Sequence, residues 1–296
     1  MAKKGFKKLL IKKLSYYREV FTLPFWRPMA LKRWFRKCNG RELHLDPPVT
    51  FCDKINWIKL YGVTDEMTRL SDKYLVRDWI KEKIGDEYLI PLIGVYDSFN
   101  EIDFSGFPER FVLKTNHACN NTIVVKDKSQ FDKKDAAEKF KEWLSYDFAF
   151  RFGYQMQYSP IKRKIIAEEF IENSGDDLFD YKFYCFDGKP LFCKLIGGRG
   201  KDTRLGMFDM EWKPLPYHET VHPLFDETPE KPERYDKLVE IATTLCQGFP
   251  FVRVDLYHLD DGSIKFGEMT FTPGSGQSTW LPEGTDEMLG AMIPIP

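Results

Sequence analysis

The sequence lacks several features that would place a chain in a special structural class. No apolar run approaches the ~18–20 residues that a membrane-spanning helix requires. Its six cysteines are scattered, without the CxxC spacing of a zinc site or the paired rhythm of a disulfide framework. We therefore expect reduced thiols in a cytoplasmic protein. Internal repeats and low-complexity tracts are also absent, which excludes a repeat architecture.

The chain has little net charge, because 44 Lys and Arg residues nearly balance 45 Asp and Glu residues. This balance hides an uneven distribution. Residues 1–41 contain thirteen basic residues and one acid, Glu19, so the remaining sequence is acidic. The composition is globular, with 43% hydrophobic and 30% charged residues, and 296 residues suffice for one large or two to three small lobes.

The basic segment 1–41 mixes its cations with aromatic and aliphatic side chains at near-helical spacing, and Pro24 and Pro28 interrupt the pattern. A basic amphipathic helix suits an anionic membrane surface, here the cytoplasmic face of a membrane. Contact with an acidic polymer, or a helix packed on the body with a solvated lysine face, are the alternatives. The short apolar stretches disfavour a secretory signal, and no nucleic-acid recognition motif accompanies the charge.

Residues 251–276, FVRVDLYHLDDGSIKFGEMTFTPGSG, predict two strands joined by a two-residue turn at Asp261-Gly262. If Asp260 pairs with Ser263, Asp255 lies opposite Glu268, and Arg253 lies opposite Thr270. Because side chains two apart share a face of a strand, these four side chains converge.

Two facing carboxylates repel each other, so their presence in an otherwise apolar hairpin needs a cause. A divalent cation provides one, since Mg²⁺ prefers oxygen ligands and bridges carboxylates to substrate phosphates. The alternatives are a protonated carboxyl group, neutralisation by Arg253, and a one-residue register slip that separates the pair.

Residues 111–125 predict a strand, a polar loop and a second strand. Lys114 ends the first strand, where a buried lysine is costly unless it meets an anion. The loop is rich in asparagine, which tolerates left-handed backbone, and successive N–H groups in such a turn can form an anion-binding nest. A polar hairpin turn with an exposed Lys114 is the alternative.

The remaining pattern predicts an α+β fold. Helices are expected at 51–61, 70–84, 131–150 and 235–247, the second opened by Ser71-Asp72. Strands are expected at 88–96, 111–113, 123–125, 165–171, 180–186 and 190–196. Helices and hairpins alternate without regular βαβ units, which favours antiparallel sheets.

Between residues 51 and 276 the chain resembles the TupA-like ATP-grasp family of the ATP-grasp superfamily. The resemblance lies in the segments SDKYLVRDWI, GDEYLIPLIGVYDS, FVLKTNH, IIAEEFIE, DYKFYCFDGKP and VRVDLYHLDDGSIKFGEMTFTPGSG. It implies two antiparallel-sheet lobes that clamp ATP, with a helical basic N-terminal extension. The implied division is 1–48 for the basic extension, 49–110 for an N-terminal lobe, 111–170 for the small lobe and 171–296 for the large lobe with the metal site.

The resemblance also implies a role for each matching residue. The residues implied to bind the nucleotide are Lys73, Arg77, Lys114, Glu168, Glu169, Ile171 and Asp180. Among them, Glu168 to Ile171 form the hinge that recognises adenine. The residues implied to bind Mg²⁺ are Asp255, Glu268 and Thr270, and the residues implied to act in catalysis are Lys182 and Arg253. Lys182 stands where the superfamily usually has Arg, and Thr270 where it usually has Asn. In the basic loop 197–205, Arg199 and Arg204 suit an anionic acceptor.

The residues and the resemblance agree, because a facing Asp–Glu pair, an Arg and a buried Lys suit Mg²⁺ bridged to a polyphosphate. We expect an ATP- and Mg²⁺-dependent carboxylate–amine ligase that forms an acylphosphate. The family is linked to teichuronopeptide and other cell-surface polysaccharide biosynthesis, so the implied substrates are small or polysaccharide-linked carboxylates and amines. The alternatives are a kinase acting on a sugar or polymer hydroxyl, and a non-catalytic protein docked to a membrane or polymer.

Overall fold

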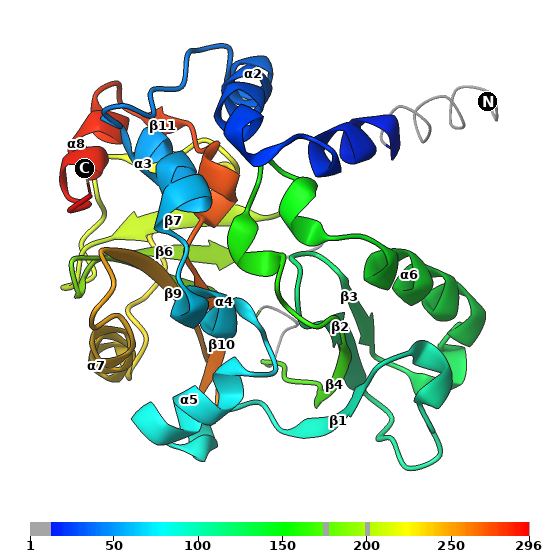
Figure 1. Cartoon of the computed structure of the whole chain (residues 1–296). Coiled ribbons are helices and arrows are strands. Elements are labelled where there is room, and N and C mark those ends of the chain that lie inside the picture. Colours follow the sequence, from blue (N-terminus) through cyan, green and yellow to red (C-terminus); the bar gives the residue numbers. More distant parts are fainter. Residues whose placement is uncertain (1–12, 174–177, 199–201, 296) are drawn as a thin grey trace.

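Two antiparallel sheets form the centre of the protein (Figure 1), in a computed structural model that describes residues 13–173, 178–198 and 202–295. The smaller sheet has the strand order β1–β4–β2–β3, with β1 at Leu92–Tyr96, β4 at Ile165–Glu169, β2 at Phe111–Thr115 and β3 at Thr122–Val125. The larger sheet has the order β10–β9–β5–β6–β7, with β10 at Ile264–Thr270, β9 at Phe251–His258, β5 at Asp180–Phe186, β6 at Lys189–Gly197 and β7 at Arg204–Phe208. A short pair joins β8, His218–Glu219, to β11, Trp280–Leu281.

Helices cover both faces of the larger sheet. Alternate residues of β5 point to opposite faces, and Phe183 meets Tyr235 of α7 while Tyr184 meets Phe51 of α3. The smaller sheet packs against α6 through Phe111 and Phe140. The helices are α2 (Arg27–Asn39), α3 (Phe51–Trp57), α4 (Asp65–Ser71), α5 (Val76–Lys83), α6 (Lys133–Ser145), α7 (Tyr235–Leu245) and α8 (Thr285–Ala291).

The N-terminal segment is helical and packs on the body. Residues 13–20 form a helix, and Leu31 and Phe35 of α2 are fully buried against Phe150 and Tyr154. Residues 1–12 of the predicted membrane-binding segment lie outside the described residues. In the part of the chain that the structure describes, no helix is long and apolar enough to cross a bilayer.

The predicted lobe boundaries stay predictions. Residues 49–110 contribute side chains to the cores of both the larger and the smaller sheet. Side chains of α3, α4 and α5 lie in the core of the larger sheet. The strand β1 pairs with β4 in the smaller sheet, and Ile102 and Phe104 lie in that sheet's core. This stretch therefore connects the two sheets.

The helix predicted at residues 70–84 is wrong as a single element. The structure ends α4 at Ser71 and begins α5 at Val76. Between them Asp72 accepts hydrogen bonds at Oδ1 from the backbone N–H groups of Tyr74 (2.8 Å) and Leu75 (3.3 Å). An aspartate that binds nearby backbone N–H groups competes with the helical pattern, which explains the break.

The pairing predicted for the 251–276 hairpin is confirmed, although the predicted turn is wrong. The backbone N–H of Leu259 donates to the carbonyl of Ser263 at 2.8 Å, so three residues form the loop instead of two. A β-bulge at Gly267 then shifts the register by one residue. The two departures compensate, so that Asp255 lies opposite Glu268 and Arg253 opposite Thr270.

The aromatic cluster around Phe51 provides a test of this packing. Its buried ring lies 5.2–6.3 Å from the rings of Tyr184, Phe186, Phe251 and Trp280. Phe51→Ala should lower the free energy of unfolding by about 3–5 kcal/mol in urea denaturation, because the cavity lies in a closely packed core. The control Val49→Ala removes an exposed side chain and should change it by less than about 0.5 kcal/mol. A loss below about 1 kcal/mol for Phe51→Ala would contradict this packing.

Candidate active site

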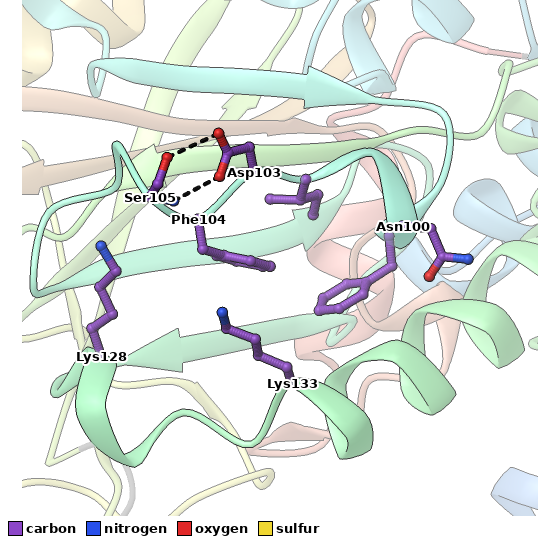
Figure 2. A pocket seen from close by; sticks show the side chains of 8 residues that line it. Asn100, Asp103, Phe104, Ser105, Lys128 and Lys133 are labelled. Atoms are coloured by element: carbon purple, nitrogen blue, oxygen red, sulfur yellow. Dashed lines mark hydrogen bonds between the residues drawn. The ribbon is translucent and has the colours of Figure 1, made fainter.

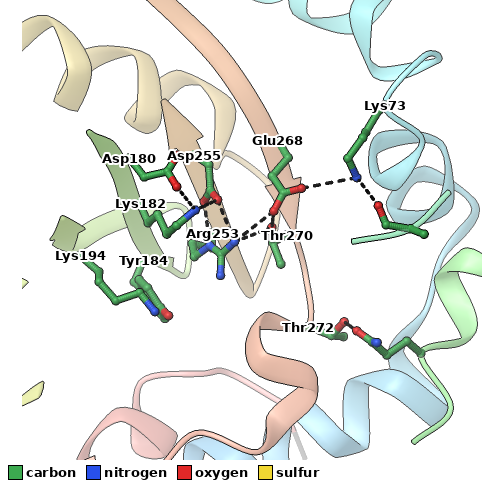
Figure 3. Close-up of polar contacts among 12 residues, drawn as sticks. Lys73, Asp180, Lys182, Tyr184, Lys194, Arg253, Asp255, Glu268, Thr270 and Thr272 are labelled. Carbon is green, nitrogen blue, oxygen red and sulfur yellow. Dashed lines mark hydrogen bonds and ion pairs between the residues drawn. The ribbon is translucent and has the colours of Figure 1, made fainter. Parts of the chain in front are cut away.

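A row of charged side chains crosses three strands on one face of the larger sheet (Figure 3). The register places Lys182 of β5 opposite Asp255 of β9, and Asp255 opposite Glu268 of β10. The Lys182 ammonium contacts the Asp255 carboxylate and lies 3.3 Å from Asp180 Oδ2. The same face continues along β5 into Tyr184 and the aromatic cluster, so the charged row lies against an apolar wall.

Arg253 holds the two facing carboxylates together. Its Nε and Nη2 atoms donate to Asp255 at 2.7 and 2.8 Å. Nη2 also donates to Glu268 Oε1 at 3.2 Å and to Thr270 Oγ1 at 3.1 Å. A guanidinium with several donors in a planar fork can bind both acids at once. In the structure Arg253 therefore offsets the repulsion, as one of the sequence alternatives proposed.

The electrostatic surroundings keep Glu268 ionised. Burial by itself would raise the pKa of this carboxyl group, but Lys73, Arg253 and Lys182 outweigh burial and lower its pKa to about 2. Burial lowers the pKa of the Lys182 ammonium, and the charge of Asp255 offsets part of that effect. The row therefore joins an ionised acid and a lysine whose proton is held less tightly than usual.

A second charged cluster lies on the smaller sheet. Glu168 of β4 is buried, and its two carboxylate oxygens bind different cations. Oε2 lies 2.6 Å from Lys114 Nζ, and Oε1 lies 3.2 Å from Arg77 Nη1. Arg77 also donates to the carbonyl of Ile90 at 2.9 Å. Lys114 thus meets an anion, as expected for a buried lysine, and that anion is Glu168.

One short segment links the two clusters. Lys73 Nζ lies 3.5 Å from Glu268 Oε2 on the larger sheet, while Arg77, one turn later, binds Glu168 on the smaller sheet. Asp72 fixes the start of this segment by accepting a hydrogen bond from Asn116 at 3.0 Å. The break in the predicted helix therefore allows Lys73 and Arg77 to reach different sheets.

The loop between β2 and β3 is largely buried and is tied to its neighbours. Asn120 adopts the left-handed conformation predicted for this loop, with φ of 61°. The N–H groups of Thr115 and Asn116 already donate to the carbonyls of Asn121 and Lys164. Lys73 Nζ donates to the carbonyl of Ala118 at 2.9 Å. An anion therefore cannot use the N–H groups of Thr115 and Asn116, and the nest predicted for the loop at 114–122 stays a prediction.

Comparison with known families decides the classification of the chain. Residues 53–294 match the family described as TupA-like ATPgrasp. The chain belongs to this family. Membership confirms the family and the α+β ATP-grasp fold predicted from the sequence, and it agrees with the predicted enzyme class, an ATP-dependent ligase. A search of curated proteins finds no match.

Among solved structures, the TupA-like chain is similar to an L-amino acid ligase from Bacillus licheniformis, with 15% identity and a TM-score of 0.45 over 76% of this chain and 48% of that chain. It is also similar to D-alanine–D-alanine ligase from Bacillus anthracis complexed with ATP, with 16% identity and a TM-score of 0.42 over 76% of this chain and 65% of that chain. The chain spans about half to two-thirds of the length of these two proteins.

The structure places the other predicted site residues of this TupA-like protein less closely together. Glu169 is exposed at the end of β4, and Ile171 follows it in a half-buried position. Arg204 binds Asp202 and Asp226, with its Nη1 atom 3.1 Å from Asp226 Oδ1. Arg199 lies outside the described residues. The roles of these residues stay predictions.

A charged cluster that the sequence analysis missed lies next to the row. Lys194 of β6 lies opposite Lys182, and its ammonium contacts the buried carboxylate of Glu219. Glu219 Oε1 accepts hydrogen bonds from Ser278 at 2.7 Å and Tyr184 at 3.3 Å. A lysine at position 194 in an apolar strand could have drawn attention to this cluster, but nothing in the sequence pairs it with Glu219 of the short strand β8.

A pocket of about 510 Å³ opens beside the smaller sheet (Figure 2). It contains no predicted site residue, and its lining is Phe99, Asn100, Ile102, Asp103, Phe104, Ser105, Lys128 and Lys133. Some of its polar groups are already bonded, since Asp103 accepts from Ser105 and Lys128 donates to the carbonyl of Phe107. The charged row remains the candidate active site.

The donor set of the row suits Mg²⁺ bound together with a nucleotide. The described residues contain no group of three or more His, Cys, Asp or Glu side chains that could form an all-protein metal cage. Asp255, Glu268 and the Thr270 hydroxyl offer oxygen donors on one face. Mg²⁺ commonly takes one or two carboxylates and completes its coordination with phosphate and water, so these residues fit it.

The low pKa of Glu268 makes a prediction about acid stability. A carboxyl group whose pKa is lower in the folded state stabilises the fold above its unfolded pKa, and this contribution disappears as the pH falls toward the folded value. Glu268→Gln should therefore be less stable than the native protein at neutral pH, by on the order of 2–3 kcal/mol. The difference should shrink as the pH falls from about 4.5 toward about 2.

Urea unfolding at a series of pH values measures this difference. Glu138→Gln, at an exposed position of α6, is the matched control and should change stability little at any pH. If the difference in unfolding free energy between Glu268→Gln and the native protein does not depend on pH, the neighbouring cations do not lower the pKa of Glu268.

Proposed function

We propose that this protein is an ATP- and Mg²⁺-dependent carboxylate–amine ligase. The observation that carries the proposal is the row of Lys182, Asp255 and Glu268, joined by Arg253, in a chain of the TupA-like ATPgrasp family. Two carboxylates and several cations that converge on one face suit a magnesium-bound polyphosphate.

The residues divide into groups with different tasks. Asp255, Glu268 and Thr270 would hold Mg²⁺, which would supply positive charge to offset the negative charge of the phosphates. Lys114 of the smaller sheet would contact the phosphates together with Lys73, which precedes α5, and Arg77, which lies in α5. Lys182 and Arg253 would bind the oxygens of the transferred phosphoryl group, where positive charge stabilises the transition state.

The hinge assignment changes in one respect. Both carboxylate oxygens of Glu168 are already bound to Arg77 and Lys114, so we assign Glu168 to the orientation of these two cations. The exposed Glu169 and the backbone as far as Ile171 remain to recognise adenine. Asp180 lies beside Lys182, and we assign it to orienting the Lys182 ammonium and to nucleotide binding.

The proposed reaction needs no nucleophilic side chain. A substrate carboxylate oxygen attacks the γ-phosphorus of ATP, the bond to the β–γ bridging oxygen breaks, and an acylphosphate and ADP form. An amine nitrogen then attacks the acyl carbon and loses its proton, and inorganic phosphate leaves. The products are an amide, ADP and phosphate. The protein binds and orients the reactants and stabilises the developing charge.

The family name supports a role in cell-surface polysaccharide biosynthesis, in a capsule, O-antigen or teichuronopeptide-like polymer. The carboxylate would then be a uronic acid or an amino acid of such a polymer, with Arg199 and Arg204 near the acceptor. We place the reaction in the cytoplasm, where ATP is supplied, and the six free cysteines suit a reducing compartment.

Product analysis tests the reaction class. The protein is incubated with Mg-ATP and panels of uronic acids and amino acids, with hydroxylamine as a trap for an acylphosphate. We expect ADP release that depends on a carboxylate and an amine, and an amide or hydroxamate in the mass spectrum. A stable phosphate ester would identify a kinase instead. Absence of Mg²⁺-dependent ATP turnover would favour a non-catalytic protein.

Substitutions in the row should abolish this turnover. Asp255→Asn and Glu268→Gln each remove a carboxylate charge from the proposed metal site, so we expect ADP formation to fall at least about 100-fold. Asp261→Asn makes the same chemical change in the exposed loop of the same hairpin and should leave the rate unchanged. Full activity of both row variants would contradict the proposal.

The cations of the row make magnesium and nucleotide binding interdependent. Lys73, Lys182 and Arg253 already neutralise Asp255 and Glu268, so Mg²⁺ alone should not bind measurably in titration calorimetry. ATP supplies the missing negative charge, and each ligand should then tighten the other. Lys73→Met should weaken Mg-ATP binding roughly tenfold and strengthen the binding of Mg²⁺ alone. Lys134→Met, an exposed control on α6, should change neither.

A further inference from the structure

Large apolar side chains gather on the outer side of the N-terminal segment. Between residues 14 and 29, seven of them are 46–77% exposed, whereas most large apolar side chains of the protein are buried. We call this set the N-terminal apolar face, and it consists of Leu14, Tyr17, Phe21, Leu23, Phe25, Trp26 and Met29. Exposed apolar groups at this density mark a surface that another body covers.

The segment cannot bury this face by turning over, because its other side is anchored. The Tyr16 hydroxyl accepts a hydrogen bond from the backbone N–H of Asp147 at 2.8 Å. Leu31 and Phe35 are fully buried, in a cluster that also contains Ala149 and Phe150. Figure 1 shows the helix at residues 13–20 and α2 along one edge of the protein, above the segment between α6 and β4. The body therefore holds the apolar face toward the outside.

The charge around the face has one sign. Residues 13–41 contain eight basic residues and one acid, and that acid, Glu19, is buried and lies 2.8 Å from Arg18. On α2, Met29 shares a helix face with Lys32, Arg33 and Arg36, because residues three, four and seven apart lie on one side of a helix. Lys32 and Arg33 are exposed. Just beyond this segment the exposed acid Glu42 lies 2.9 Å from Arg36 and offsets that one cation. The surface thus combines apolar groups with an excess of cations.

We propose that the N-terminal apolar face docks on an anionic lipid bilayer. Aromatic side chains such as Tyr17 and Trp26 favour the boundary between headgroups and acyl chains. Lysine and arginine near the surface add attraction to anionic headgroups. A protein partner fits less well, because interface cores are depleted of charge and interfaces contain little lysine. The proposal concerns a surface outside the ATP site and does not depend on the ligase assignment.

Vesicle flotation tests the proposal. The full chain is mixed with vesicles of phosphatidylcholine alone, or of phosphatidylcholine with phosphatidylglycerol. We expect it to float with the anionic vesicles, to bind neutral vesicles weakly, and to dissociate as salt is raised. The variant Phe21→Ser/Phe25→Ser/Trp26→Ser should lose at least about tenfold in affinity. Lys32→Glu/Arg33→Glu should lose about tenfold or more.

Matched controls carry the same chemical changes at other exposed positions. Val124→Ser/Val221→Ser removes exposed apolar side chains, and Lys134→Glu/Lys141→Glu reverses two charges on α6. Both should bind anionic vesicles like the native chain. Circular dichroism checks that every variant folds.

Three results would overturn the proposal. The first is that the native chain does not bind anionic vesicles. The second is that the triple serine variant binds them as well as the native chain does. The third is that the native chain forms a dimer which the triple variant dissociates, without any binding to vesicles, since the face would then join two copies of the protein.

Discussion

The placement of like charges on one buried sheet face constrains the rest of the structure. Asp255 and Glu268 lie opposite each other in neighbouring strands, and such a pair destabilises a sheet unless cations accompany it. Arg253 binds both acids, while Lys182 and Lys73 each bind one. The cations come from three separate parts of the sequence. Neutralising this pair therefore draws together the hairpin, the neighbouring strand and the segment that precedes α5.

That segment gives the two sheets a common connection. Lys73 binds an acid of the larger sheet, and Arg77 binds an acid of the smaller sheet. A ligand that replaces Lys73 on Glu268 would also act on the segment that holds Arg77. Nucleotide binding between the sheets would thus change contacts in both sheets at the same time. The same side chains that stabilise the protein without a ligand are those proposed to bind phosphate.

The sequence was sufficient where local chemistry fixes the outcome. Asp187-Gly188, between the strands expected at 180–186 and 190–196, has positive φ at both residues, as a type I′ hairpin turn requires, and the alternation of β5 is visible in the sequence. Arg253 and Asp255 share a face for the same reason. The pairing of Asp255 with Glu268 was also predicted, but a longer loop and a bulge at Gly267 produce it together. A two-residue turn and a three-residue loop with a bulge give the same pairing, and only the backbone geometry of the hairpin shows which of them is present.

By itself the sequence pointed to the family through its motifs. Period-two alternation, which acts over a few residues, also indicated the antiparallel α+β fold and placed Arg253 and Asp255 on one face of a strand. The tertiary structure decided which distant groups meet these residues. It brought Lys73 to Glu268, bound Glu168 to Lys114, and paired Lys194 with Glu219. Such contacts depend on how separate elements pack, and a single sequence carries no local signal for them.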